Sequence, residues 1–272
     1  MRYYGCEIFN GGIQMKVVIL AGGFGTRISE ESFLRPKPMI EIGGAPILWH
    51  IMKIFSSYGF DDFVICAGYK QQVIKEYFAN YYLYKSDVTF DFSDSGKMIV
   101  HNNESERWRV TIVDTGYDTM TGGRVKRIAQ YVENNTFFLT YGDGVADVDI
   151  NKLLKYHKSH KKILTVTAVN PGQRFGVLGL DKEGNINRFH EKRSKDAELI
   201  NGGYMVAEPQ IFDYIEGDST FLEKEPLERL VKDGQVAGFQ HDGFWQCMDT
   251  QRDKEKLELL WLDNKAPWKV WK

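Results

Sequence analysis

Cysteine is scarce in this chain of 272 residues and follows no pattern. The three cysteines, Cys6, Cys66 and Cys247, are odd in number and widely spaced. This spacing excludes a disulfide framework, and it does not fit a tetrahedral zinc site. We therefore expect a protein of the reducing cytoplasm.

The chain also lacks an excess of charge and a long apolar run. It has 35 basic and 37 acidic residues, a formal net charge of −2, which argues against nucleic acid or an anionic membrane as the main partner. No apolar stretch approaches the roughly 20 residues of a membrane span, and residues 1–14 lack the basic and apolar parts of a signal peptide. Local basic side chains must therefore hold any anionic ligand.

The length is sufficient for one large domain, which would bury roughly three quarters of its unfolded surface. Residues 1–14 show no periodicity, and Met15 comes just before the first strong strand pattern. We expect residues 1–14 to be a disordered N-terminal extension and residues 15–272 to form the domain.

Hydrophobic periodicity predicts strands and helices in alternation through the first part of the chain. Strands are expected at 16–21, 62–67, 88–92, 98–101, 109–113, 137–140, 163–169, 174–180, 186–190 and 205–207. Helices are expected at 47–58, 71–81, 121–131, 150–159, 209–215, 221–232 and 252–262. This order predicts an α/β fold, with a mainly parallel sheet covered by helices on both faces and ligands at the carboxyl ends of the strands.

A glycine-rich loop follows the first strand. Gly22 and Gly23 allow the backbone to approach a ligand closely, while Arg27 and Lys37 can hold phosphate oxygens. The loop is not a P-loop, and Ile28 stands where a dinucleotide-binding motif needs its third glycine. A tight connection without a ligand is the alternative. We expect the prolines on both sides of Lys37 to keep it in extended backbone.

Asp143 lies between two glycines after the strand predicted at 137–140. A carboxylate at the end of a central strand is suited to hold Mg²⁺ against phosphates. An ordinary Asp-Gly turn is the alternative.

Several ordered motifs together resemble those of the sugar-1-phosphate nucleotidyltransferases. The first is the Leu-Ala-Gly-Gly-x-Gly-Thr-Arg string at 20–27, with Lys-Pro at 37–38. The segments 28–32 and 243–250 resemble the glucose-1-phosphate cytidylyltransferase branch. The resemblance implies a single Rossmann-like, mainly parallel sheet with a smaller strand-rich, sugar-binding part. It also implies Mg²⁺, CTP and glucose 1-phosphate as ligands, a homo-oligomer, and a product used to make deoxysugars for surface polysaccharide.

The resemblance also implies roles for single residues. The residues implied to bind the nucleotide are Leu20, Ala21, Gly22, Gly23, Thr26, Arg27, Lys37, Thr121, Gly122, Gly123 and Arg124. Those implied to bind the sugar phosphate are Gly142, Gly176, Glu191, Lys192, Asn201 and Gly202. Asp143 and Asp249 are implied metal ligands, and Arg27, Lys37 and Asp143 are the expected catalytic residues. Arg193 and Cys247 depart from the family pattern, because each stands where the family has proline.

The reaction so implied is an in-line displacement at the α-phosphorus of CTP, in which positioning and charge neutralisation supply the catalysis. Two alternatives remain open. One is another nucleotidyltransferase, which uses dTTP or UTP or a different phosphorylated acceptor. The other is a regulatory subunit that binds a nucleotide sugar without turning it over, although such a subunit would not need metal-binding carboxylates.

Overall fold

The computed structural model describes residues 15–25, 28–94, 96–171, 177–180, 186–190 and 199–271. The N-terminal extension expected at residues 1–14 lies outside them. Within the described part of the chain, no helix has the length and apolar character that crossing a membrane requires.

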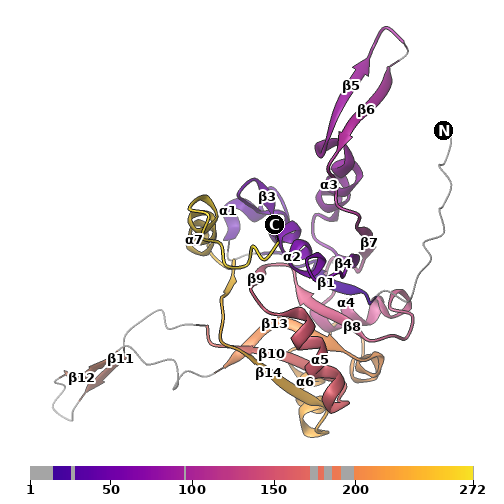
Figure 1. Ribbon diagram of the computed structural model, residues 1–272. Helices are drawn as coiled ribbons and strands as arrows, with labels where there is room; N and C mark the ends of the chain where they lie inside the picture. The colour runs from indigo at the N-terminus through magenta and orange to yellow at the C-terminus, as the bar shows by residue number, and fades with distance from the viewer. Residues whose placement is uncertain are drawn as a thin grey trace.

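A seven-stranded sheet forms the centre of the molecule (Figure 1). Its strands, in spatial order, are β14 (Val236–His241), β10 (Leu164–Val169), β13 (Ile200–Ala207), β8 (Phe137–Tyr141), β1 (Val17–Ala21), β4 (Asp62–Ala67) and β7 (Arg109–Asp114). β8, β1, β4 and β7 run parallel, and β13 is antiparallel to both of its neighbours. The predicted mainly parallel sheet is thus confirmed.

Helices cover both faces of this sheet, which explains why β1 is apolar at every position and wholly buried. Val17, Ile19 and Ala21 pack into one core with helices α2 (Ile47–Ser56) and α5 (Ile150–His160). Val18 and Leu20 pack into a second core on the opposite face, with helices α4 (Thr121–Arg127) and α6 (Glu225–Lys232).

Periodicity predicts most of the helices, although not α1. The helices are α1 (Ser29–Ser32), α2 (Ile47–Ser56), α3 (Gln71–Tyr84), α4 (Thr121–Arg127), α5 (Ile150–His160), α6 (Glu225–Lys232) and α7 (Gln251–Leu262), with 3-10 turns η2 (Lys37–Met39), η3 (Ala129–Tyr131) and η5 (Pro209–Tyr214). The helix predicted at 221–232 begins only at Glu225, because Pro226 is placed in its first turn. Residues 221–224 are therefore free to pack elsewhere.

Two local predictions about the site were wrong. Lys37 is not extended but opens the turn η2, in which Ile40 N–H donates to its carbonyl at 3.1 Å. The extended residue is Pro36, so hydrogen bonding and burial of the turn override the bias of a residue that precedes proline. β13 also begins earlier than predicted and includes Asn201, with Gly203 at φ +83° beside an irregularity in the ladder.

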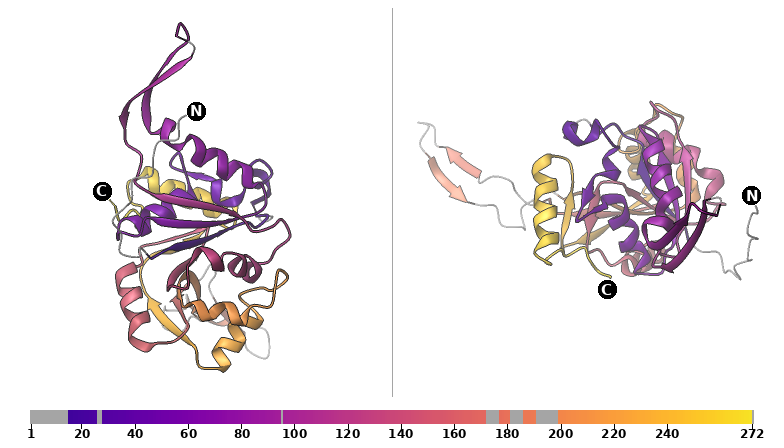
Figure 2. Two further views of the ribbon diagram at one scale, coloured as in Figure 1. Left: turned by 90° about the vertical axis from the view of Figure 1, so that its right-hand side faces the viewer. Right: turned by 90° about the horizontal axis from the view of Figure 1, so that it is seen from above.

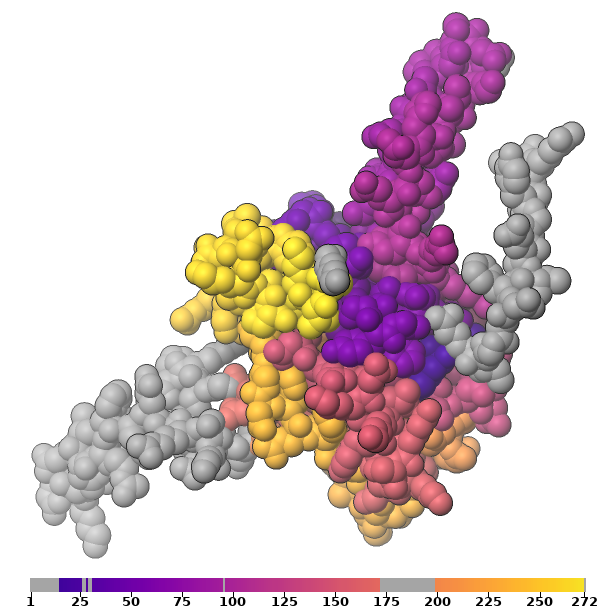
Figure 3. Space-filling view, in the orientation of Figure 1, coloured from indigo at the N-terminus to yellow at the C-terminus, as the bar shows by residue number. Residues whose placement is uncertain are grey.

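Four small two-stranded sheets complete the described part. Their strands are β2 (Glu41–Ile42), β3 (Ala45–Pro46), β5 (Ser86–Asp91), β6 (Lys97–Asn103), β9 (Gly144–Ala146), β15 (Trp245–Cys247), β11 (Val177–Leu180) and β12 (Ile186–His190). The β5–β6 hairpin extends away from the body of the molecule (Figure 3).

The C-terminal tail, residues 263–271, packs against its own domain, beside α2 and α7 (Figure 2). Trp268 is 0% exposed, and its ring lies 6.2 Å from that of His50 on α2. The tail therefore closes one of the two cores rather than remaining in water.

Candidate functional site

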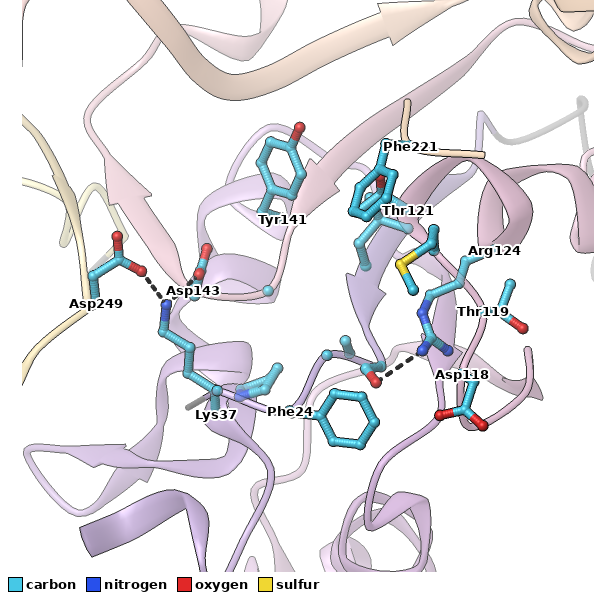
Figure 4. Close-up of a pocket in the computed structure, with 18 residues that line it drawn as sticks. Phe24, Lys37, Asp118, Thr119, Thr121, Arg124, Tyr141, Asp143, Phe221 and Asp249 are labelled. Atoms are coloured by element: carbon cyan, nitrogen blue, oxygen red, sulfur yellow. Dashed lines mark hydrogen bonds and ion pairs between the residues drawn. The ribbon is translucent and has the colours of Figure 1, made fainter. Parts of the chain in front are cut away.

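A cleft of about 380 Å³ opens at the carboxyl ends of β1 and β8, where an α/β sheet binds its ligands. Figure 4 shows Lys37, Asp143 and Asp249 at one end, and Asp118, Thr119, Thr121, Arg124 and Phe221 at the other. The lining residues are Leu20, Ala21, Gly22, Gly23, Phe24, Gly25, Lys37, Pro38, Asp118, Thr119, Met120, Thr121, Arg124, Tyr141, Gly142, Asp143, Phe221 and Asp249. The cleft thus brings together most of the residues expected to bind the nucleotide.

At the end of the cleft near Asp249, Lys37 is held between two carboxylates. Its Nζ lies 2.5 Å from Asp143 Oδ2 and 2.5 Å from Asp249 Oδ1, and the residue is 9% exposed. Burial acts to lower the pKa of Lys37, but the two carboxylates outweigh it and the pKa is raised. The ammonium group therefore stays charged at neutral pH.

Strand and helix ends position these carboxylates. Asp143 lies two residues after the end of β8, and its carbonyl accepts a hydrogen bond from Met248 N–H at 2.8 Å. Asp249 stands immediately before the N-cap of α7, where Thr250 and Asp253 form a capping box. The expected helix start is therefore present at Asp249, and it aims the carboxylate at Lys37 as well.

The glycine loop lies against a buried arginine. Arg124 Nη2 donates to Gly22 O at 3.0 Å, and Arg124 Nη1 donates to Gly116 O at 2.7 Å and to Thr115 Oγ1 at 2.8 Å. A Cβ atom on Gly22 would lie 2.2 Å from Arg124 Nη1, so any side chain there would displace the Arg124 guanidinium group from its present position. Arg124 thus ties the loop after β1 to the loop after β7.

The residues of the predicted glycine turn at the start of α4 do not all face the cleft. Thr121 lines the cleft. The N–H groups of Gly122 and Gly123 instead donate to the carbonyl of Thr220, at 2.9 and 3.2 Å. These two backbone donors are thus paired within the chain.

A second pocket, of about 220 Å³, adjoins the first and shares Tyr141, Asp143 and Asp249 with it. Asn201 and Gly202, two of the residues expected to bind the sugar phosphate, line it. Trp245 Nε1 donates to Gly202 O at 2.7 Å and fixes this part of β13. The two pockets therefore meet at the carboxylate pair.

Cys247 also lines the second pocket. Burial and then the neighbouring Asp249 raise the pKa of its thiol to about 11. The thiol is therefore protonated at neutral pH and is a poor nucleophile.

The residues present fit a magnesium ion. In the described ranges, no three or more His, Cys, Asp or Glu side chains converge on one point, which does not favour a cage made of protein alone. Two carboxylates around one cation position suit Mg²⁺, which binds through one or two carboxylates together with substrate phosphates.

Six residues singled out from the sequence lie outside the described residues. They are Thr26, Arg27, Gly176, Glu191, Lys192 and Arg193. Conversely, sequence motifs did not identify Tyr141 or Phe221 as site residues. Tyr141 directly precedes the Gly142-Asp143 motif, which was a usable signal, whereas Phe221 comes near the cleft only through the fold.

The chain is similar to several known proteins. The nucleotidyl transferase family model matches residues 16–263. Over 258 residues, the chain is 55% identical to glucose-1-phosphate cytidylyltransferase of Salmonella typhimurium and 42% identical to a probable glucose-1-phosphate cytidylyltransferase of Bacillus subtilis. Both alignments cover 94% of this chain and 100% of the relative. The crystal structure of HddC from Yersinia pseudotuberculosis has the same fold, with a TM-score of 0.65 at 23% identity, covering 91% of this chain and 99% of that one.

Proposed function

Because this chain belongs to the nucleotidyl transferase family, we propose that it transfers a cytidylyl group from CTP to glucose 1-phosphate, giving CDP-glucose and pyrophosphate. One observation carries the proposal: a larger and a smaller pocket meet at Asp143 and Asp249. A reaction that joins two phosphorylated substrates needs such a junction between their sites. The identity to two cytidylyltransferases supports CTP and glucose 1-phosphate as the pair.

The chemistry is a displacement at phosphorus. A phosphate oxygen of glucose 1-phosphate attacks the α-phosphorus of CTP, and the bond from that phosphorus to the bridging oxygen of the β-phosphate breaks. Pyrophosphate leaves with the electron pair. The attacking oxygen is already ionised, so no general base is needed, and the protein has to align the two phosphates and neutralise their charge.

Lys37 is proposed to supply part of that charge. Its ammonium is charged and buried beside the junction, where water screens it little. Mg²⁺ on Asp143 and Asp249 would neutralise phosphate charge there when bound. Arg27 is proposed to share the triphosphate with Lys37.

The remaining residues are proposed to orient the substrates. Gly22 and Gly23 would let the nucleotide approach the backbone after β1. Asn201 and Gly202, in the second pocket, would contact the glucose hydroxyls, and Lys192 would hold the phosphate of glucose 1-phosphate.

A pyrophosphate-release assay tests this function. The purified protein is given CTP, UTP, dTTP or GTP with glucose 1-phosphate, and then CTP with galactose 1-phosphate or mannose 1-phosphate, in the presence of Mg²⁺. We expect CTP with glucose 1-phosphate to give the highest kcat/KM by at least an order of magnitude. Equal rates with UTP would contradict the cytidylyl assignment, and no release with any pair would contradict catalysis.

A further inference from the structure

The segment 216–224, between η5 and α6, forms a wall of the nucleotide cleft that no sequence motif marks. It is held to the start of α4 by backbone hydrogen bonds, from Met120 N–H to Asp218 O at 2.8 Å and from Gly122 N–H to Thr220 O at 2.9 Å. Asp218 also forms an ion pair with Arg127 at 2.5 Å. These contacts thus hold the segment against α4.

A side-chain link fixes the far end of this segment. Glu223 accepts a hydrogen bond from Thr121 Oγ1 at 2.6 Å and another from the Tyr141 hydroxyl at 2.5 Å. Thr121 lines the larger pocket, and Tyr141 lines both pockets. Glu223 therefore spans from α4 to the end of β8, and the residues just before it have a defined position.

Phe221 is the residue of this segment that lines the cleft. It lies beside Thr121, at the end away from Asp249 (Figure 4), and 40% of it is exposed. The other exposed aromatic of the cleft, Phe24, is already packed against Tyr117 at 5.0 Å and Tyr69 at 5.4 Å. The contact of the Phe221 ring is instead with the Lys224 ammonium, which lies 4.4 Å from the ring centroid.

We propose that Phe221 is a nucleotide-binding residue that stacks on the base of the nucleoside triphosphate. This inference rests on the proposed function only for the direction in which the nucleotide lies. With the triphosphate at Lys37, Asp143 and Asp249, the base reaches the opposite end of the cleft, where Phe221 presents its ring. Aromatic side chains stack on any base, because every base has a π face. Phe221 therefore adds affinity for the nucleotide without selecting cytosine.

Isothermal titration calorimetry of the Phe221→Ala protein tests the proposal with two probes, CTP and inorganic tripolyphosphate, each with Mg²⁺. Loss of the stack should weaken CTP binding by roughly tenfold, the lower part of the range for one stacked base. It should leave tripolyphosphate binding unchanged, because that probe has no base. Phe221→Tyr should restore CTP binding, and Phe221→Leu should restore it only in part. Phe92→Ala, an exposed phenylalanine after β5, is the matched control and should bind both probes as the wild type does.

Steady-state kinetics give a second readout. The KM for CTP should rise in Phe221→Ala by about the same factor, while the KM for glucose 1-phosphate and kcat stay within about twofold. Unchanged CTP affinity in Phe221→Ala and Phe221→Leu would overturn the inference and leave the proposed function intact. An equal loss for CTP and tripolyphosphate would also overturn it, because the effect would then not come from the base. Since the binding assay needs no turnover, it decides the inference even if the wild type proves inactive with CTP.

Discussion

At the scale of single residues, the charge balance of the cleft depends on Lys37. Its ammonium is the cation found between Asp143 and Asp249, and it keeps two carboxylates close together that would otherwise repel. The same charge is available to phosphate oxygens that enter the cleft. One lysine thus serves both the free protein and the proposed reaction.

Removal of either partner should abolish most turnover. Lys37→Met keeps the aliphatic stem but removes the charge, and Asp143→Asn removes one carboxylate charge. Each should lower kcat for pyrophosphate release by about 100-fold or more, as expected for loss of one preorganised charge contact. Lys152→Met, on an exposed side chain of α5, is the control and should keep wild-type turnover. Wild-type rates in both site variants would refute the proposed mechanism.

His50 predicts how stability depends on pH. Its ring is buried between the backbone of Ile42 and the side chain of Trp268, with Nε2 2.8 Å from Ile42 O and Nδ1 3.4 Å from Trp268 Nε1. Burial lowers its pKa to about 4, although the hydrogen bond to Ile42 opposes this. Because the folded pKa lies below the unfolded value of about 6.5, the unfolded chain binds the proton first. The contribution of His50 to the free energy of unfolding is therefore complete above pH 6.5 and is lost as the pH falls toward 4.

Urea unfolding at pH 7 and pH 5 measures this effect. His50 should account for a loss of about 2 kcal/mol in the free energy of unfolding between the two values. His50→Gln, which does not titrate, should lose that much less than the wild type over the same interval. Parallel losses in the two proteins would show that His50 does not carry the pH dependence.

At the scale of elements, the start of α7 couples helix stability to the site. Thr250 accepts a hydrogen bond from Asp253 N–H at 3.3 Å, and Asp253 Oδ2 accepts one from Thr250 N–H at 2.9 Å. Asp249 is the next residue toward the N-terminus and points at Lys37. The capping box that begins the helix therefore also orients a proposed metal ligand.

Thr250→Ala should have two effects. It should lower the free energy of unfolding by about 1 kcal/mol through loss of the cap, and kcat by about tenfold because Asp249 loses its fixed direction. Asp149→Ala removes the N-cap of α5, where Asp149 accepts from Lys152 N–H at 2.9 Å, and should cost similar stability without the loss of kcat. Urea unfolding and pyrophosphate release measure the two effects. Equal kcat losses in the two variants would contradict the coupling.

At the scale of the whole molecule, the C-terminal tail completes the core beside the sheet. Trp268 is fully buried, and its ring stacks with Phe244 at a centroid distance of 5.5 Å. Phe244 lies just before β15, which pairs with β9 directly after the Asp143 loop. Residues near the end of the chain thus support strands that line the second pocket.

Trp268→Ala should cost about 3–5 kcal/mol in the free energy of unfolding, because it removes a large buried side chain and leaves a cavity. Val270→Ala, two residues later and 38% exposed, should change it by less than about 0.5 kcal/mol. Urea denaturation at pH 7 measures both. A cost below about 1 kcal/mol for Trp268→Ala would show that the tail is not part of the cooperative core.

Local patterns alone predicted much of this protein. The apolar run at 17–21 predicts a buried strand, because it is short and rich in β-branched residues, and a strand covered on both faces is apolar at every position. The glycines after it, Asp143 after β8 and the helix start near Asp249 were also identifiable, since each depends on neighbouring residues. The extended backbone expected at Lys37 was wrong, because hydrogen bonds within the turn η2 outweigh the bias before proline.

Only the tertiary structure decided which of these features meet. Lys37 lies 106 residues from Asp143 and 212 from Asp249. They become neighbours because β1 pairs with β8 and because α7 begins beside the loop after β8. Phe221 likewise reaches the cleft only because segment 216–224 docks on α4, about 100 residues away in the chain. Periodicity reports which face of an element is buried, but it carries no record of what that face is buried against.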